Sequence, residues 1–213
     1  MIVLYTKILE DFHNERLNRY IHLFNAELQE KILKYKKWDD CQRSLLGYVL
    51  LSNGLERLGM STHFINEIMF NDFGKPYIKG CPIYFNISHS KEIVVCALSN
   101  QTEIGIDIEY IEPICFRNFR PFMLSSEWSK IKEEDNCLDE FYHYWTQKEA
   151  VLKADGSGLS TNLRSFEIKN GRTYINNDFF YVTNLYIEDN YCCSLAIKKL
   201  HYRNITIDSI FIL

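Results

Sequence analysis

Two carboxylates stand in a segment that is otherwise suited to the interior of a sheet. Residues 104–110 read IGIDIEY, which places Asp107 and Glu109 two positions apart. Successive side chains of a strand point to opposite faces, so the isoleucines would share one face and the two acids the other. Like charges on neighbouring positions of one face repel each other unless water, a lysine or a metal ion lies beside them. An edge strand with a solvated face and a metal site both remain open for this heptapeptide.

A second chemically capable group lies in the segment FYHYWTQKEAVLKADGSGLS at residues 141–160. Its apolar spacing predicts a helix over about 138–153 that ends at Asp155-Gly156. Glu149 and Lys153 are four residues apart and therefore share one helix face, next to Lys148. Taken alone, such a pair is a surface ion pair that contributes about 0.3–0.5 kcal/mol.

Groups that suit an anion occur earlier in the chain. The segment FGKPYIKG predicts a turn that displays Lys75, and YFNISHSKEIVVCAL predicts two strands joined by a polar turn with Ser88 and His89. His89 also suits a catalytic base, although no nucleophile elbow accompanies it. A basic cluster at 29–43 contains Lys31 and Arg43, and it fits one phosphorylated ligand or a solvated helix face.

Composition describes an ordinary globular protein. The 213 residues are 46% hydrophobic and 24% charged, and the net charge of −4 argues against nucleic acid or an anionic membrane as partner. The first residues, MIVLYTKILEDF, are too short and too soon charged for a signal peptide or a membrane span, which predicts a cytoplasmic protein. The seven cysteines are odd in number and lack CxxC spacing, so we expect buried free thiols.

The elements that must position these groups occur in a faint repeat. A helix at about 40–59 is followed by strands that end in EIVVCALSN, and the helix at 138–153 is followed by strands that end in NYCCSLAIKK. This order predicts two α+β halves, 1–103 and 104–213, with IGIDIEY opening the second half.

The succession GKP, FNISHS, IGIDIE and WxxKEAxxK resembles the Sfp-type 4′-phosphopantetheinyl transferase family, over about residues 27–160. The resemblance implies a pseudo-twofold α+β monomer with the ligand in a cleft between the halves. The first half would hold the 3′-phosphate and adenosine of coenzyme A, and the second the metal and the carrier protein.

The activity implied by the resemblance is transfer of the 4′-phosphopantetheine arm of coenzyme A to a serine of an apo carrier protein, with release of adenosine 3′,5′-bisphosphate. By similarity, Mg²⁺ or Mn²⁺ would be bound by Asp107, Glu109 and Glu149. The expected contacts to coenzyme A come from both halves: Lys31, Arg43, Lys75, Ser88, His89, Lys148 and Lys153.

The resemblance also names a catalytic set of Glu149, Glu127 and Lys153. Glu149 would accept the serine proton directly or through water, and Glu127 in FMLSSEW would orient that step. One departure is Leu28, where some relatives carry a second lysine that binds the 3′-phosphate; Lys34 would take its place.

Two rival functions use the same residues: a Mg²⁺-dependent phosphohydrolase of coenzyme A or a nucleotide, and a non-catalytic module that binds coenzyme A or a carrier. Three metal carboxylates favour an enzyme over the module. The carrier is expected at residues 110–128, and four apolar side chains there suit a docking surface and a core equally: Ile114, Phe116, Phe119 and Phe122.

Overall fold

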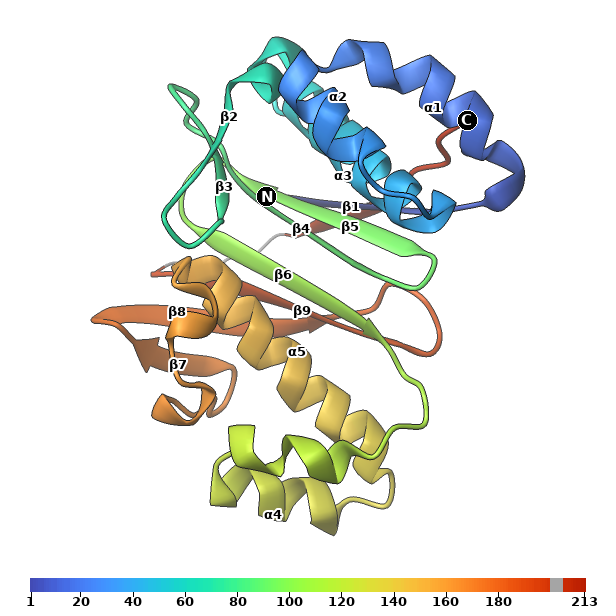
Figure 1. Cartoon of the computed structure of the whole chain (residues 1–213). Coiled ribbons are helices and arrows are strands. Elements are labelled where there is room, and N and C mark those ends of the chain that lie inside the picture. The colour runs from blue at the N-terminus through green and yellow to red at the C-terminus, as the bar shows by residue number, and fades with distance from the viewer. Residues whose placement is uncertain (200–204) are drawn as a thin grey trace. The chain divides into compact units, whose positions relative to one another are not determined.

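A computed structural model describes residues 1–199 and 205–213 (Figure 1). Contacts divide the described chain into two compact units. The first contains Met1–Asn71, Pro76–Gln101 and the described residues from 205 onward, and the second contains Asp72–Lys75 and the described residues from Thr102 to 199. The expected division between 103 and 104 differs from these units in the C-terminal segment, in the four residues 72–75, and at Thr102 and Glu103, which belong to the second unit.

The first unit is built on a four-stranded sheet with the order β10-β1-β5-β4. Strand β1 (Ile2–Lys7) pairs antiparallel with β5 (Ile93–Ser99), which forms a hairpin with β4 (Tyr84–Ser90). Strand β10 (Thr206–Ser209) pairs parallel with the other edge of β1. A separate ribbon consists of β2 (Ile68–Phe70) and β3 (Pro76–Ile78).

The helices of the first unit pack against this sheet through α3 (Trp38–Arg57), the longest of them. The shorter helices are α1 (His13–Tyr20) and α2 (Ala26–Leu33). Helix α3 ends as expected just before Gly59, whose φ of +72° favours glycine. The core between α3 and the sheet is apolar, with Leu4, Val94, Cys96 and Leu98 among its strand members.

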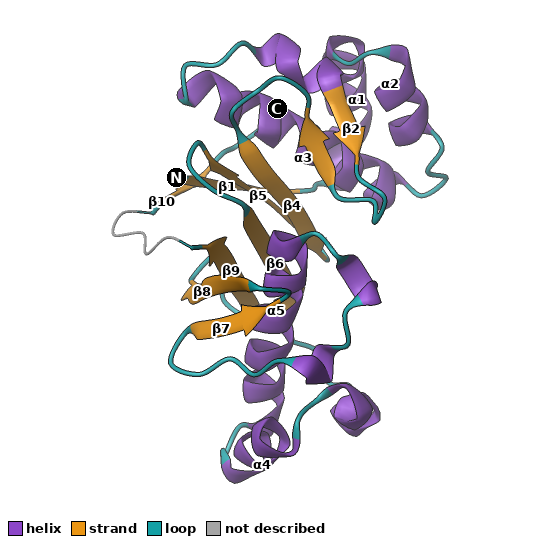
Figure 2. Ribbon diagram, turned by 90° about the vertical axis from the view of Figure 1, so that its left-hand side faces the viewer, coloured by secondary structure: helices purple, strands orange, loops and turns teal. Residues whose placement is uncertain are grey.

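The second unit has a sheet with the order β6-β9-β8-β7, and all of its pairs are antiparallel. Its strands are β6 (Ile104–Tyr110), β7 (Arg172–Ile175), β8 (Asp178–Leu185) and β9 (Tyr191–Lys198). Figure 2 shows the long helix α5 (Cys137–Asp155) running along the sheet, with the short helix α4 (Ser125–Glu133) near one of its ends. Gly156, with a φ of +81°, caps α5.

The two units repeat one topology, and the predicted α+β class is confirmed. In each, a first strand is followed by a long helix, and the chain returns through a hairpin whose last strand lies antiparallel beside the first strand. The triplets are β1-β5-β4 and β6-β9-β8. The similar sequences VVCALS and CCSLAI are the central strands of these triplets.

Two details differ from the expectation. Ser88 and His89 lie inside β4, paired with Val95 and Val94, and the turn is formed by Lys91 and Glu92 instead. All seven cysteines are free, but only four are buried: Cys41, Cys96, Cys192 and Cys193. In the described part of the chain, no helix has the length and apolar character needed to cross a membrane.

Candidate active site

Strand β6 and helix α5 approach each other closely at Gly105. A Cβ atom at this position would clash with the backbone of Ala150 and Ala154 on α5. Because side chains alternate along a strand, Asp107 and Glu109 share the face of Gly105 that is turned toward α5. The predicted strand and its two faces are therefore present.

The face of β6 that carries Asp107 is shielded from solvent, although β6 is an edge strand of its sheet. Asp107 is only 4% exposed, so the solvated edge strand is the wrong interpretation for this residue. Its Oδ1 accepts a hydrogen bond from Lys153 Nζ at 2.6 Å, which joins the strand to the helix through an ion pair.

Glu149 lies one helical turn before Lys153. Burial and the nearby Asp107 carboxylate raise the pKa of Glu149, while the Lys153 ammonium acts in the opposite direction. The three side chains therefore form one electrostatically coupled group: two acids on facing elements with a lysine beside them.

The predicted metal ligands are only partly brought together. Carboxylate oxygens without histidine or cysteine suit Mg²⁺, and Asp107 and Glu149 influence each other electrostatically. Glu109 lies two residues beyond Asp107 on the same face of β6 and is half-buried. Within residues 1–199 and 205–213, no three His, Cys, Asp or Glu side chains are already gathered as a metal cluster. The donor chemistry fits the ion, whereas a preformed triad is not in place.

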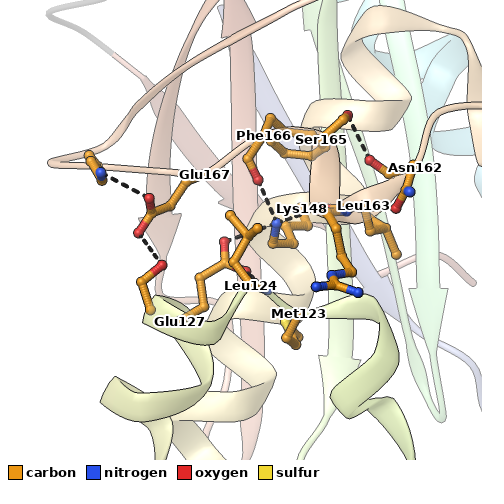
Figure 3. Close-up of polar contacts among 12 residues, drawn as sticks. Met123, Leu124, Glu127, Lys148, Asn162, Leu163, Ser165, Phe166 and Glu167 are labelled. Carbon is orange, nitrogen blue, oxygen red and sulfur yellow. Dashed lines mark hydrogen bonds and ion pairs between the residues drawn. The ribbon is translucent and has the colours of Figure 1, made fainter.

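Lys148 and Glu127 form a buried ion pair (Figure 3). Lys148 Nζ lies 2.9 Å from Glu127 Oε1 and donates to the carbonyl oxygens of Leu163 and Phe166 at 2.7 and 2.9 Å. Glu127 Oε2 accepts from the backbone amide of Leu124 at 2.8 Å. Both side chains are almost completely buried, at 0% and 1% exposure.

This pair connects three segments of the second unit: the start of α4, the middle of α5 and the loop after α5. Burial lowers the pKa of Lys148, and the Glu127 carboxylate opposes that shift. An ammonium with three protein acceptors is a structural group in this arrangement, which differs from the expected contact with phosphate.

Lys75 also lies on the second unit. Its Nζ forms an ion pair with Glu103 at 2.6 Å and donates to the carbonyl oxygen of Ala154 at 2.8 Å. The expected turn thus brings Lys75 to the C-terminal end of α5.

The predicted coenzyme A contacts of the first unit lie in two groups. Arg43 pairs with Asp39 and Asp40 at 2.9 and 2.7 Å, and it donates to the carbonyl oxygen of Lys91, two residues after the exposed His89. Ser88 is buried in β4.

Lys31 lies 3.9 Å from the centre of the Phe70 ring. Burial and the positive charge of Lys34 lower the pKa of Lys31. Leu28, the departure from the family pattern, is a buried core residue.

Most of the apolar residues considered for carrier docking belong to a core. Ile114, Phe116 and Phe119 pack against the cluster around Phe141, whereas Phe122 is 49% exposed.

Two features of the site were missed by sequence reasoning. Glu103 directly precedes β6 and belongs to no motif. The hydroxyls of Thr146 and Ser194 form a buried hydrogen bond of 2.9 Å between α5 and β9. A serine in the apolar strand sequence CCSLAI was the available signal for the second feature.

Comparison with known proteins gives this site its context. The family model described as the 4′-phosphopantetheinyl transferase superfamily matches residues 103–196. The chain is 35% identical over 158 residues to 4′-phosphopantetheinyl transferase Sfp of Bacillus subtilis (strain 168), covering 73% of this chain and 70% of that protein. It is 34% identical over 176 residues to 4′-phosphopantetheinyl transferase gsp of Aneurinibacillus migulanus, covering 80% and 72%.

Among solved structures, the holo-[acyl-carrier-protein] synthase (AcpS) of Thermotoga maritima aligns with a TM-score of 0.39 at 20% identity, covering 47% of this chain and 64% of that chain. The sequence relatives define the class: the chain belongs to the 4′-phosphopantetheinyl transferase superfamily. Within it, the chain is an enzyme of the Sfp type, and the predicted family is confirmed.

Proposed function

We propose that the protein transfers the 4′-phosphopantetheine arm of coenzyme A to a serine of an apo carrier protein. The observation that supports this proposal best is the group formed by Asp107, Glu149 and Lys153 across β6 and α5. The two rival functions, hydrolysis and binding alone, are outcomes of the test below.

In the proposed reaction, the serine Oγ forms a bond to the phosphorus that carries the pantetheine arm. The bond from that phosphorus to the bridging oxygen breaks, and adenosine 3′,5′-bisphosphate leaves. The serine proton passes to the carboxylate of Glu149, directly or through water.

The other side chains prepare the site for this reaction. The Lys153 ammonium, held beside Asp107, would bind an oxygen of the pyrophosphate and orient it. When bound by Asp107, Glu109 and Glu149, Mg²⁺ would neutralise pyrophosphate charge. For the first unit, we propose four ligands of the 3′-phosphate and adenosine: Lys31, Arg43, Ser88 and His89.

Glu127 and Lys148 receive a different assignment from the one their motif implies. Their full burial supports a role in positioning α5 against α4, with no direct contact to the substrate. We also propose a monomeric, cytoplasmic enzyme, and sedimentation of the purified protein tests the first of these two statements.

The test follows the mass of apo carriers of the fatty-acid, polyketide and nonribosomal-peptide types, mixed with Mg²⁺ and coenzyme A. We expect at least one carrier to gain the mass of the phosphopantetheine arm, and Lys153→Met to abolish that gain. Lys79→Met is the matched control, because Lys79 is exposed at the end of β3. Free phosphopantetheine without carrier modification would indicate a hydrolase. Binding of coenzyme A without any product would indicate a binding module.

A further inference from the structure

Lys75 connects the two elements that carry the candidate active site. The second unit includes the short segment Asp72–Lys75, although its neighbours Asn71 and Pro76 belong to the first unit. At the end of this segment, the Lys75 ammonium contacts Glu103, the residue before β6, and the carbonyl oxygen of Ala154, near the end of α5.

Both contacts have a physical reason. The last four carbonyl groups of a helix lack partners inside the helix, and a cation near them is favourable to the helix dipole. Ala154 O is such a group, and Lys75 donates to it at 2.8 Å. The ion pair with Glu103 is partly shielded from water, because the Lys75 side chain is 15% exposed.

The place of these contacts matters for the site. Gly105 follows Glu103 by two residues, and it is the point where the backbone of β6 meets Ala150 and Ala154 of α5. Lys153, which pairs with Asp107, directly precedes Ala154. A shift of α5 along β6 would therefore separate the groups that must act together.

We propose that Lys75 and Glu103 form a clamp that holds the C-terminal end of α5 in register with β6. In this proposal Lys75 is a positioning residue, and Glu103 shares its function. The kinetic part of the proposal depends on the transferase function proposed above, whereas the structural part does not.

The experiment compares Lys75→Met, Glu103→Gln and the double variant with Lys79→Met as the control. A clamp predicts that both single variants lower kcat by at least about tenfold and leave the KM for coenzyme A within about twofold of wild type. The double variant should be no slower than the slower single variant, because each change breaks the same clamp. Lys79→Met should behave as wild type.

Hydrogen exchange of the same proteins provides a measurement that needs no turnover. We expect faster exchange in the last turns of α5, residues 150–156, in both single variants and not in Lys79→Met. If wild type modifies no carrier but both variants show this faster exchange, the clamp stands while the transferase function fails.

Two results would overturn the clamp. One is a large rise in the KM for coenzyme A in Lys75→Met with none in Glu103→Gln, which would make Lys75 a ligand of the substrate. The other is unchanged exchange at residues 150–156 in both variants.

Discussion

The first strands of the two units take the same place in the triplets β1-β5-β4 and β6-β9-β8, yet β1 contributes Leu4 to a core and β6 contributes Asp107 to the candidate site. Leu4 of β1 pairs with Cys96 of β5, and Asp107 of β6 pairs with Ser194 of β9. Cys96 and Ser194 correspond when VVCALS is aligned with CCSLAI. Leu4 and Asp107 therefore take equivalent positions, and both face the long helix of their unit.

The two units also differ in which element carries the small residue at the contact between helix and sheet. In the first unit the small residues are on the helix, where Gly54 of α3 leaves room for the Leu98 side chain. In the second unit the small residue is on the strand, where Gly105 admits the backbone of α5. The closest contact between helix and sheet is therefore on the central strand β5 in the first unit and on the edge strand β6 in the second. In the second unit, Lys153 of α5 lies next to Asp107 of β6. The candidate site thus differs from the equivalent core position in two local features, the location of the small residue and the presence of charge.

The largest effect on stability should come from placing at Leu4 the aspartate that the second unit has at the equivalent position. Leu4→Asp places a carboxylate at a position that is fully buried among apolar side chains, so we expect a loss of about 5 kcal/mol or failure to fold. Thermal unfolding monitored by circular dichroism measures it. Near wild-type stability would contradict the expected difference between the apolar face of β1 at Leu4 and the face of β6 that carries Asp107.

Next is the buried cation of the second unit. Lys148→Met leaves the Glu127 carboxylate buried without its ion pair, and we expect a loss of about 3–5 kcal/mol in the free energy of unfolding. Adding Glu127→Gln should recover part of that loss, because no unpaired charge remains. A double variant that is less stable than the single one would contradict the assignment of this pair to structure.

The reciprocal exchange, Asp107→Leu, should leave the fold intact because the first unit tolerates leucine at the equivalent position. We expect carrier modification to fall by at least about 100-fold, since an acid of the site and the anchor of Lys153 are lost. Carrier mass measures the rate, and circular dichroism verifies the fold. Activity within twofold of wild type would remove Asp107 from the site.

The close approach at Gly105 predicts a smaller effect. Gly105→Ala places a methyl group against the backbone of α5, which cannot rotate away, so we expect a loss of about 1–3 kcal/mol. Gly47→Ala in α3 is the matched control, because its Cβ would meet the movable Ile87 side chain at 3.0 Å. Equal melting temperatures of the two variants would contradict this difference.

The smallest effect concerns pH. The folded-state pKa of Glu149 is raised, so its contribution to stability is fully present below the unfolded pKa, near 4.5, and is lost as pH rises through the folded value. We expect Glu149→Gln, measured with a metal chelator, to gain melting temperature relative to wild type between pH 4 and pH 7.5. A difference that is independent of pH would contradict the raised pKa.

Much of the fold followed from local patterns in the sequence. The segment IGIDIEY is the strand β6, and the helix expected at 138–153 is α5 (Cys137–Asp155). Periodicity and capping glycines are local properties, which is why they identified these elements. The repeat of two central strands was visible for the same reason.

The tertiary roles of single lysines were not visible in the same way. The KEA motif gives no sign that Lys148 points inward, because its carboxylate partner is on another helix. No sequence pattern indicates a role for Glu103, and only its ion pair with Lys75 in the structure does so. The sequence shows which charges are present, whereas their pairing depends on how strands and helices far apart in the chain meet.

The pairing of β10 with β1 has a consequence for the synthesis of this protein. Strand β1 is translated before the main segment of the second unit, and its partner Thr206–Ser209 is translated after it. One edge of β1 therefore has no strand beside it while the ribosome translates the second unit, and an open sheet edge is a site of wrong association. Arg16, fully buried and bonded to the carbonyl oxygen of Ile212, can take up its final contacts only after translation reaches that residue. The first unit can thus be completed only after the second unit has been translated.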